Sequence, residues 1–306
     1  MPRFAAIDVG TNSVLLLVAE RDAAGRFEAL SERAEITRLG RGVDRTHLLA
    51  PEAIDETVEC ISDFAREARE LGAQQIAVTA TSAARDAQNG RDFLRAAGER
   101  AGVEVEIISG DREAQLTFAA VRADFADRGA LVAMDIGGGS TELIYGRGDV
   151  PGIAFRKSFD VGSVRLTERF VTADPVPAED RRRLRAHLDQ AFAALPPPAG
   201  RFTLVGVAGT VTTLYAVARG IEPYDAKKVH GQALGLEELR AWTERLCDLP
   251  LQQRRSLRGL QPKRADVICA GGYILLAAME RLGAAECVVS DRGVRWGLMV
   301  DRFGAR

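Results

Sequence analysis

The sequence lacks any hydrophobic run long enough to cross a membrane. A transmembrane helix needs about 20 predominantly apolar residues, and no such run occurs among the 306 residues. The N-terminus, MPRFAAIDVG, leads directly into a strand-like segment, without the charged, apolar and cleavage regions of a secretory signal. We therefore expect a cytoplasmic protein with no membrane partner.

The sequence also has a small net charge and few cysteines. With 41 basic and 43 acidic residues, the formal net charge is −2, which disfavours nucleic-acid binding driven by overall charge. The cysteines form no C-x-x-C pair and have no nearby histidine, so they predict no zinc site. We expect all of them to be reduced and mostly buried: Cys60, Cys247, Cys269 and Cys287. The chain has no low-complexity segment, and its length favours two domains.

The most informative feature that is present is an internal repeat. The segment IDVGTNSVLLLV, residues 7–18, recurs as MDIGGGSTELIY, residues 134–145. Each copy reads as a strand, a glycine-containing turn and a second strand, and so predicts a duplicated hairpin. The aligned pairs are Asp8 with Asp135, Gly10 with Gly137, Ser13 with Ser140 and Leu16 with Leu143.

Strands alternate with helices in the rest of the chain, which favours a layered α/β fold. Residues 51–72 repeat apolar side chains at steps of three and four after Pro51, and predict an amphipathic helix that stops at Gly72. Segments 75–87 and 201–218 each read as a strand, a turn and the start of a helix, with further strands at 103–109 and 286–290 and further helices at 112–126, 178–195, 236–247, 264–282 and 291–303.

Two abutting domains with a cleft between them are expected from this organisation. We divide the chain into an N-terminal domain, residues 1–126, and a C-terminal domain, residues 127–306. The last helix of the second domain is a candidate to pack back on the first.

Three glycine-bearing turns follow apolar strands, at 10–13, 137–141 and 206–213. Such turns let backbone N–H groups approach an anion closely, and Ser or Thr hydroxyls add donors, which is typical of phosphate sites. A tight hairpin is the alternative for any single turn, but the repeat favours phosphate binding. The predicted substrate-binding residues are Gly10, Thr11, Asn12, Ser13, Gly137, Gly138, Gly139, Ser140, Thr141, Gly209 and Thr210.

Acidic residues flank the repeated turns. Mg²⁺ is held by one or two carboxylates together with phosphate oxygens and water. Asp8, Asp135 and Glu142 are therefore predicted ligands of Mg²⁺ or another divalent cation. Glu142 is also a candidate to hold the attacking water, and the alternative for each Asp is that it caps its own turn.

Six segments, in order along nearly the whole chain, resemble the Ppx/GppA family of exopolyphosphatases and guanosine pentaphosphate phosphohydrolases. The resemblance is to short members of the family and implies two ribonuclease-H-like domains, as in actin, sugar kinases and chaperone ATPases, flanking a phosphate-binding cleft. It also implies a homodimer. The segments are AAIDVGTNSVLLLV, TATSAARDAQNGRDFL, IISGDREAQLTFAAV, MDIGGGSTELIYG, VGVAGTVTTL and VVSDRGVRWGLM.

The same resemblance assigns catalytic roles. Glu113 would be the general base that activates water, Arg85 would clamp phosphate with its planar donor fork, and Asp135 and Glu142 match essential acids. The alternatives are a first-turn acid favoured by the helix dipole for Glu113 and a surface arginine for Arg85. The chain departs from the family where Arg112 replaces a second acid and Trp296 replaces a frequent Glu.

The leading hypothesis is a Mg²⁺-dependent exopolyphosphatase that removes terminal phosphate from inorganic polyphosphate, with guanosine pentaphosphate as a second candidate substrate. The alternatives are an ATP-dependent kinase of the same superfamily and a non-catalytic sensor of guanosine tetra- or pentaphosphate. Several basic residues are candidates to line a path for the polyanion, although each is alternatively a solvated charge: Lys227, Lys228, His230, Lys263, Arg264 and Arg292.

Overall fold

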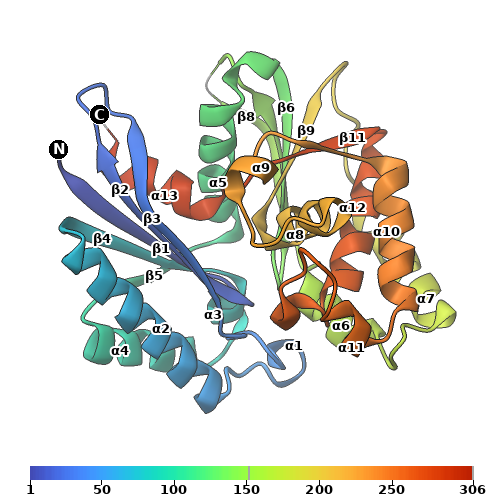
Figure 1. Ribbon diagram of the computed structural model, residues 1–306, viewed down its shortest axis with the longest axis horizontal. Coiled ribbons are helices and arrows are strands. Elements are labelled where there is room, and N and C mark those ends of the chain that lie inside the picture. Colours follow the sequence, from blue (N-terminus) through green and yellow to red (C-terminus); the bar gives the residue numbers. More distant parts are fainter. Residues whose placement is uncertain (151, 305–306) are drawn as a thin grey trace. The chain divides into compact units, whose positions relative to one another are not determined.

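The computed structural model describes residues 1–150 and 152–304, and the chain forms two compact units (Figure 1). Unit 1 comprises Met1–Ala120 and the chain from Gly293 onward, and unit 2 is Val121–Arg292. The predicted boundary between residues 126 and 127 therefore lies six residues later than in the structure, within the turn that follows helix α5 (Gly110–Asp124). The segment from Gly293 onward belongs to unit 1. It was predicted in the second domain, with its last helix as a candidate to pack back on the first.

The sheet of unit 1 has the strand order β3-β2-β1-β4-β5. The first three strands are antiparallel neighbours, and β4 and β5 continue the sheet in parallel with β1. Apolar residues on both faces of β1 are buried, because helices cover both sides. The strands are β1 (Arg3–Val9), β2 (Ser13–Arg21), β3 (Phe27–Ile36), β4 (Ala73–Ala80) and β5 (Val105–Ile107).

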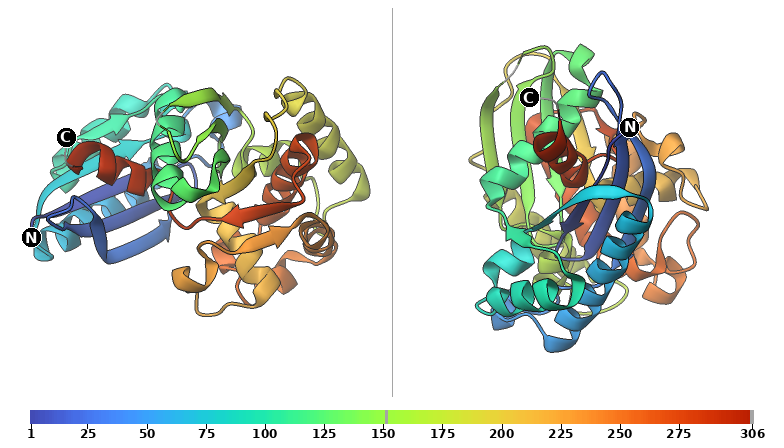
Figure 2. Two further views of the ribbon diagram at one scale, coloured as in Figure 1. Left: turned by 90° about the horizontal axis from the view of Figure 1, so that it is seen from above. Right: turned by 90° about the vertical axis from the view of Figure 1, so that its left-hand side faces the viewer.

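Helices α2 (Pro51–Glu70) and α4 (Gly90–Ala101) cover one face of this sheet, and α5 and α13 (Val294–Phe303) cover the other. Helix α2 confirms the helix predicted at 51–72, whereas α4 was not predicted. Figure 2 shows α13 against the first strands in both views, and the ring of Phe303 stacks on Phe4 with centroids 4.6 Å apart. The remaining helices of this unit are α1 (Val43–Thr46) and α3 (Ser82–Asp86).

The sheet of unit 2 has the order β10-β11-β9-β6-β7-β8. Its run β8-β7-β6-β9-β11 repeats the order and the strand directions of unit 1, so the duplication extends from the hairpin to the sheet. The strands are β6 (Ala130–Ile136), β7 (Thr141–Arg147), β8 (Ile153–Phe159), β9 (Thr203–Val207), β10 (Ala233–Gly235) and β11 (Glu286–Val289).

The helices of unit 2 bury one large apolar cluster against this sheet. Helix α12 begins at Ile268 instead of the predicted 264, because residues 262–264 form a separate 3₁₀ turn, η2 (Pro262–Arg264). The other elements are η1 (Ala126–Arg128), α6 (Ser163–Phe170), α7 (Ala178–Phe192), α8 (Ala208–Arg219), α9 (Ala226–Val229), α10 (Leu236–Asp248), α11 (Leu251–Arg254) and α12 (Ile268–Leu282).

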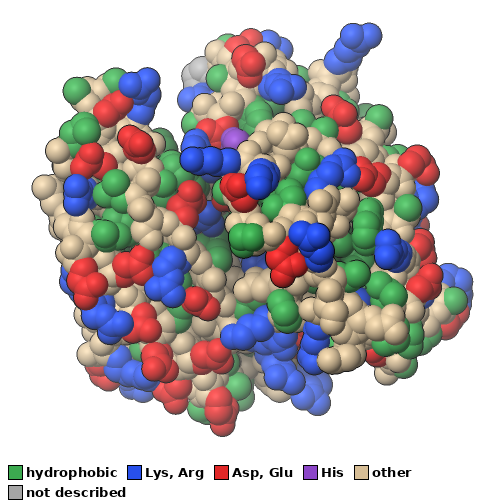
Figure 3. Space-filling model, viewed as in Figure 1, with side chains coloured by type: hydrophobic (Ala, Val, Ile, Leu, Met, Phe, Trp, Pro, Cys, Tyr) green, Lys and Arg blue, Asp and Glu red, His purple; other side chains and the backbone are tan. Residues whose placement is uncertain are grey.

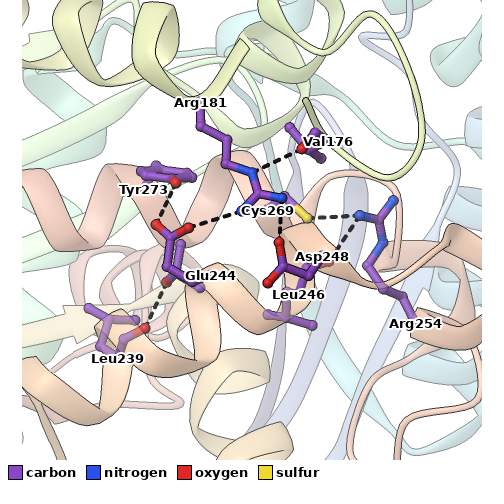
Figure 4. Close-up of polar contacts among 10 residues, drawn as sticks. Val176, Arg181, Leu239, Glu244, Leu246, Asp248, Arg254, Cys269 and Tyr273 are labelled. Carbon is purple, nitrogen blue, oxygen red and sulfur yellow. Dashed lines mark hydrogen bonds and ion pairs between the residues drawn. The ribbon is translucent and has the colours of Figure 1, made fainter. Parts of the chain in front are cut away.

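The cysteines are free thiols and mostly buried, as predicted. Cys269, in the first turn of α12, accepts a hydrogen bond from Arg254 Nη1 at 3.0 Å (Figure 4). Arg254 Nη2 also donates to Asp174 Oδ1 at 2.7 Å. A hydrogen bond from the Cys247 thiol and the charge of Arg254 hold the pKa of Cys269 below its ordinary value. This polar cluster joins α10, α11 and α12 inside unit 2.

Candidate active site

The two repeated glycine turns are each closed by the same kind of backbone hydrogen bond. Gly10 N donates to Ser13 O at 2.9 Å in unit 1, and Gly137 N donates to Ser140 O at 3.0 Å in unit 2. A Cβ added to either glycine would lie 3.2 Å from that carbonyl oxygen, so a side chain would crowd the turn. Compact turns of this kind can present successive backbone amides to an anion.

In unit 1, predicted site residues gather at the carboxyl ends of the parallel strands β1, β4 and β5. Asp8 is buried near the end of β1, Arg85 follows β4 in α3, and Glu113 follows β5 in the first turn of α5. Ligands of open α/β sheets bind at this edge. The sheet topology therefore places these residues where a substrate site is expected.

Arg85 and Glu113 contact each other directly. Arg85 Nη1 donates to Glu113 Oε2 at 3.3 Å and to Ile108 O at 3.0 Å. The Glu113 side chain is 8% exposed and that of Arg85 is 26% exposed, so the pair is partly shielded from water. Within unit 1, Arg85 therefore contacts the carboxylate of Glu113 and is not a solvated surface arginine.

In unit 2, Asp135 and Glu142 stand directly opposite each other across β6 and β7. Both are buried, at 6% and 0% exposure, and Glu142 Oε1 accepts a hydrogen bond from Ser158 Oγ at 2.6 Å. Opposed residues of an antiparallel pair place their Cβ atoms about 5 Å apart on one face, where like charges destabilise the pair. A divalent cation would offset this repulsion, so the donor set fits one.

The metal prediction is less well supported for Asp8. Its partner across β1 and β2 is Leu15, not an acid. In the described part of the chain, no group of three or more His, Cys, Asp or Glu side chains could hold a metal ion. The donor set that fits a cation is therefore the Asp135–Glu142 pair, and Mg²⁺ characteristically completes such a set with phosphate and water oxygens.

The third turn lies beside the second in unit 2. Strands β6 and β9 are parallel neighbours, and Thr210 Oγ1 donates to Ile136 O at 3.1 Å. Within this turn, Ala208 has φ 69°, in the left-handed region that a residue with a side chain rarely adopts. Strained backbone of this kind is found preferentially at ligand sites.

Arg264 lies against the third turn. A Cβ added to Gly209 would be 1.8 Å from Arg264 Nη1, so the guanidinium rests on the glycine. Burial lowers the pKa of Arg264. Of the basic residues predicted to line a polyanion path, Arg264 is thus in direct contact with a predicted phosphate turn.

The other basic residues of that prediction have local partners or are exposed. Arg292 Nη1 lies 2.7 Å from Asp124 Oδ1, His230 Nε2 lies 3.8 Å from Asp124 Oδ2, and Lys228 Nζ lies 3.6 Å from Asp225 Oδ2. Lys227 and Lys263 are exposed. Figure 3 shows Lys and Arg mixed with Asp and Glu over most of the face in view.

The chain matches the family model of Ppx/GppA phosphatases over residues 17–305. The chain belongs to the Ppx/GppA phosphatase family. It is 36% identical to a Mycobacterium tuberculosis protein named Exopolyphosphatase 2, and the alignment covers 99% of each chain.

Solved Ppx/GppA structures have the same fold. The crystal structure of an exopolyphosphatase-like protein superimposes with a TM-score of 0.89 at 32% identity, covering 99% of this chain and 98% of that one. The Aquifex aeolicus Ppx/GppA enzyme gives a TM-score of 0.83 at 32% identity, covering 98% and 99%. The predicted fold class, with two ribonuclease-H-like α/β units, is confirmed.

The two departures from the Ppx/GppA pattern have structural roles in unit 1. Arg112, next to Glu113, forms an ion pair with Asp301 of α13. Trp296 is buried in the apolar cluster beside α5, and its Nε1 donates to Glu32 Oε2 at 3.2 Å. Both residues therefore attach α13 to the rest of unit 1.

Sequence reasoning missed the segments that support the glycine turns. In unit 1, Gly40 N donates to Thr11 O at 2.8 Å and Arg38 N donates to Asn12 O at 3.0 Å. In unit 2, the support comes from α6, which was not predicted. These contacts are mostly between backbone atoms, so side-chain patterns gave little signal for them.

The remaining expectations for this Ppx/GppA protein concern its environment. No helix of the described residues is long and apolar enough to cross a membrane. The cytoplasmic location and the homodimer stay predictions.

Proposed function

We propose that this protein is an exopolyphosphatase that hydrolyses the terminal phosphoanhydride bond of inorganic polyphosphate. The observation that carries the proposal is the repeated glycine turn, with matching Gly N to Ser O bonds and a buried acid before each copy. Backbone amides that no side chain covers can donate hydrogen bonds to phosphate oxygens, and carboxylates beside them can bind a divalent cation and water. Relatives that align over nearly the whole chain are named exopolyphosphatases, which supports the same activity.

In this proposal Glu113 is the general base. Water attacks the terminal phosphorus in line, its proton passes to the Glu113 carboxylate, and the bond from phosphorus to the bridging oxygen breaks. Orthophosphate and a chain shortened by one unit leave. The Arg85 contact holds the carboxylate in one orientation, which raises the fraction of time that it can accept the proton.

The glycine turns would bind the phosphate oxygens through backbone amides. We assign this role to the residues of the 10–13 and 137–141 turns and to Gly209 and Thr210, with Arg264 adding positive charge at the third turn. A Mg²⁺ ion, or another divalent cation, would be held by Asp135 and Glu142. When bound, it would neutralise charge on the phosphoryl oxygens; the role of Asp8 as a further ligand stays a prediction.

Phosphate release from polyphosphates of graded length tests the proposal, with guanosine pentaphosphate assayed in parallel as the second candidate substrate. Glu113→Gln should lose roughly 10²-fold or more in rate, the scale of general-base catalysis. The matched control is Asp111→Asn, which removes an acid from the same first turn of α5. Equal loss in both variants would mean that helix charge, and not proton transfer, is responsible.

Two alternatives predict different outcomes in the same assays. A sensor would bind guanosine tetra- or pentaphosphate at saturating Mg²⁺ without turnover. A kinase would transfer label from ATP to a sugar, whereas a hydrolase transfers the phosphoryl group to water. The hydrogen bond from Arg85 to Glu113, in the first turn of α5, favours the hydrolase over these alternatives. It offers an oriented carboxylate that can accept a proton from water.

A further inference from the structure

The first backbone amides of α6 donate hydrogen bonds to the glycine turn of unit 2. Ser163 N donates to Gly137 O at 3.0 Å. Val164 N and Arg165 N both donate to Gly138 O, at 2.9 Å and 3.1 Å. The first amides of a helix have no partner within the helix. Here they bind carbonyl oxygens of the turn, so α6 supports the turn and is not itself an anion site.

A side chain completes this arrangement. Arg165 Nε donates to Gly139 O at 2.7 Å, a short bond from a charged donor. Because Gly139 is the last glycine before Ser140, this bond fixes the peptide unit that the first amides of α6 do not contact.

Holding the carbonyls determines where the amides point. In a trans peptide unit the C=O of one residue and the N–H of the next point in opposite directions. With the carbonyls of Gly137, Gly138 and Gly139 directed at α6, the amides of Gly138, Gly139 and Ser140 are directed away from it. An anion bound by the turn would therefore lie on the side opposite α6.

The approach of α6 to the turn is close. A Cβ added to Gly162, the residue before α6, would lie 2.3 Å from Gly138 O and 2.5 Å from Gly139 C. These are backbone atoms and cannot move without changing the turn. Glycine at position 162 therefore permits the contacts of Ser163 and Arg165.

The turn of unit 1 is supported differently. Its carbonyls at Thr11 and Asn12 accept hydrogen bonds from backbone amides of Gly40 and Arg38. A side-chain donor to the glycine turn is thus found in unit 2, where a single substitution can remove it without altering the backbone.

We propose that Arg165 is a positioning residue for phosphate binding. Its Nε fixes the Gly139–Ser140 peptide unit, so that the Ser140 amide, together with those of Gly138 and Gly139, donates to the terminal phosphate. This inference rests on the proposed function for its substrate. It concerns a residue to which neither the sequence motifs nor the family comparison gives a role.

Three variants test the proposal through steady-state phosphate release and thermal unfolding. Arg165→Ala should lower kcat/KM about tenfold, the scale of one hydrogen bond from a charged donor, with little change in Tm. Arg165→Lys keeps the charge but loses the Nε donor, and should remain impaired. Arg169→Ala, the matched control, removes a positive charge from the last turn of the same helix and should behave as wild type.

A binding measurement separates positioning from general stability. Orthophosphate added to protein labelled with ¹⁵N-glycine should shift the Gly138 and Gly139 amide resonances. In Arg165→Ala, about tenfold more phosphate should be needed for half the shift. A purely structural role would lower Tm and leave this affinity unchanged.

The outcomes distinguish this inference from the proposed function. Saturable amide shifts without phosphate release from polyphosphate would overturn the hydrolase and leave the positioning role standing. Normal hydrolysis in Arg165→Ala, full activity in Arg165→Lys, or an equal loss in Arg169→Ala would overturn the positioning role. If Arg165→Ala does not fold, Arg165→Lys decides.

Discussion

Asp135 and Glu142 are directly opposed across β6 and β7, and both are buried. Two carboxylates in this arrangement repel each other, so the metal-free protein bears a cost that a bound cation would remove. Binding of a cation at this pair should therefore change the thermal stability of the protein as well as its activity.

Glu142→Gln should therefore stabilise the metal-free protein and abolish its response to Mg²⁺. Removing one of two opposed charges is worth up to about 1 kcal/mol, or a rise in Tm of about 2–4 °C. Phosphate release should fall about 10²-fold because the electrostatic stabilisation of the phosphoryl group is lost. Thermal scans with and without Mg²⁺ measure the first effect, and the phosphate assay measures the second.

The control for this variant is Ser158→Ala. It removes the 2.6 Å hydrogen bond to Glu142 but keeps both carboxylates, so its Tm should still rise when Mg²⁺ is added. If Glu142→Gln lowers the Tm of the metal-free protein and still responds to Mg²⁺ like wild type, the cation does not bind at this pair.

The Arg85–Glu113 contact predicts non-additive effects on the rate. If Arg85 acts by orienting Glu113, Arg85→Lys should lower kcat at least about tenfold, but should lower it no further in a Glu113→Gln background. A double-mutant cycle on kcat measures this coupling. Losses that multiply would show instead that Arg85 acts independently of Glu113, as a phosphate clamp would.

The sequence predicted the repeated hairpins because Asp, Gly and Ser recur at fixed spacing, and the helix at 51–72 because its apolar residues repeat at helical steps. It did not predict α6, which has only eight residues, nor the exposed strand β3. Short or weakly patterned elements form because tertiary contacts stabilise them, and such contacts are not visible in local sequence.

The same distinction applies to the candidate site. Asp135 and Gly137 could be identified in the sequence, because an acid and a glycine directly after a predicted strand are recognisable by residue type alone. The Arg165 bond to Gly139 was not visible, because it depends on the angle at which α6 leaves a turn after β8. Residues that position backbone atoms give little signal in a single sequence.

Two glycines with close neighbours should respond differently to alanine. A Cβ at Gly209 would meet the Arg264 guanidinium, a flexible group that can swing aside, whereas a Cβ at Gly297 would lie 2.0 Å from Leu116 O in the backbone of α5. Gly209→Ala should keep a near-normal Tm and lose phosphate release. Gly297→Ala should lower stability by about 1–3 kcal/mol, the usual cost of overpacking.

Urea unfolding and the phosphate assay, applied to both variants, check this contrast. The prediction fails if Gly209→Ala is as destabilised as Gly297→Ala, since Arg264 would then be held too firmly to move. It also fails if Gly209→Ala hydrolyses polyphosphate at the wild-type rate, because the third turn would then have no part in binding.

His187 predicts a pH dependence of stability in the mildly acidic range. In α7 its ring lies 5.1 Å from that of Phe170, and partial burial, with the nearby charge of Arg169, lowers its pKa. The unfolded chain therefore takes up a proton on this side chain at a higher pH than the folded protein does. As pH falls through the unfolded value of about 6.5, the free energy of unfolding should decrease, and it should level off below the depressed folded value.

His187→Gln removes this titration, so its urea midpoint should fall less than that of wild type between pH 7.5 and pH 5.5. The difference between the variant and wild type should be small, equivalent to a change of about a degree in Tm, because solvent screens a partly exposed group. The matched control is His47→Gln at an exposed position of unit 1, which should keep the wild-type slope. If His187→Gln has the wild-type slope as well, carboxylates and not this histidine set the acid sensitivity of unit 2.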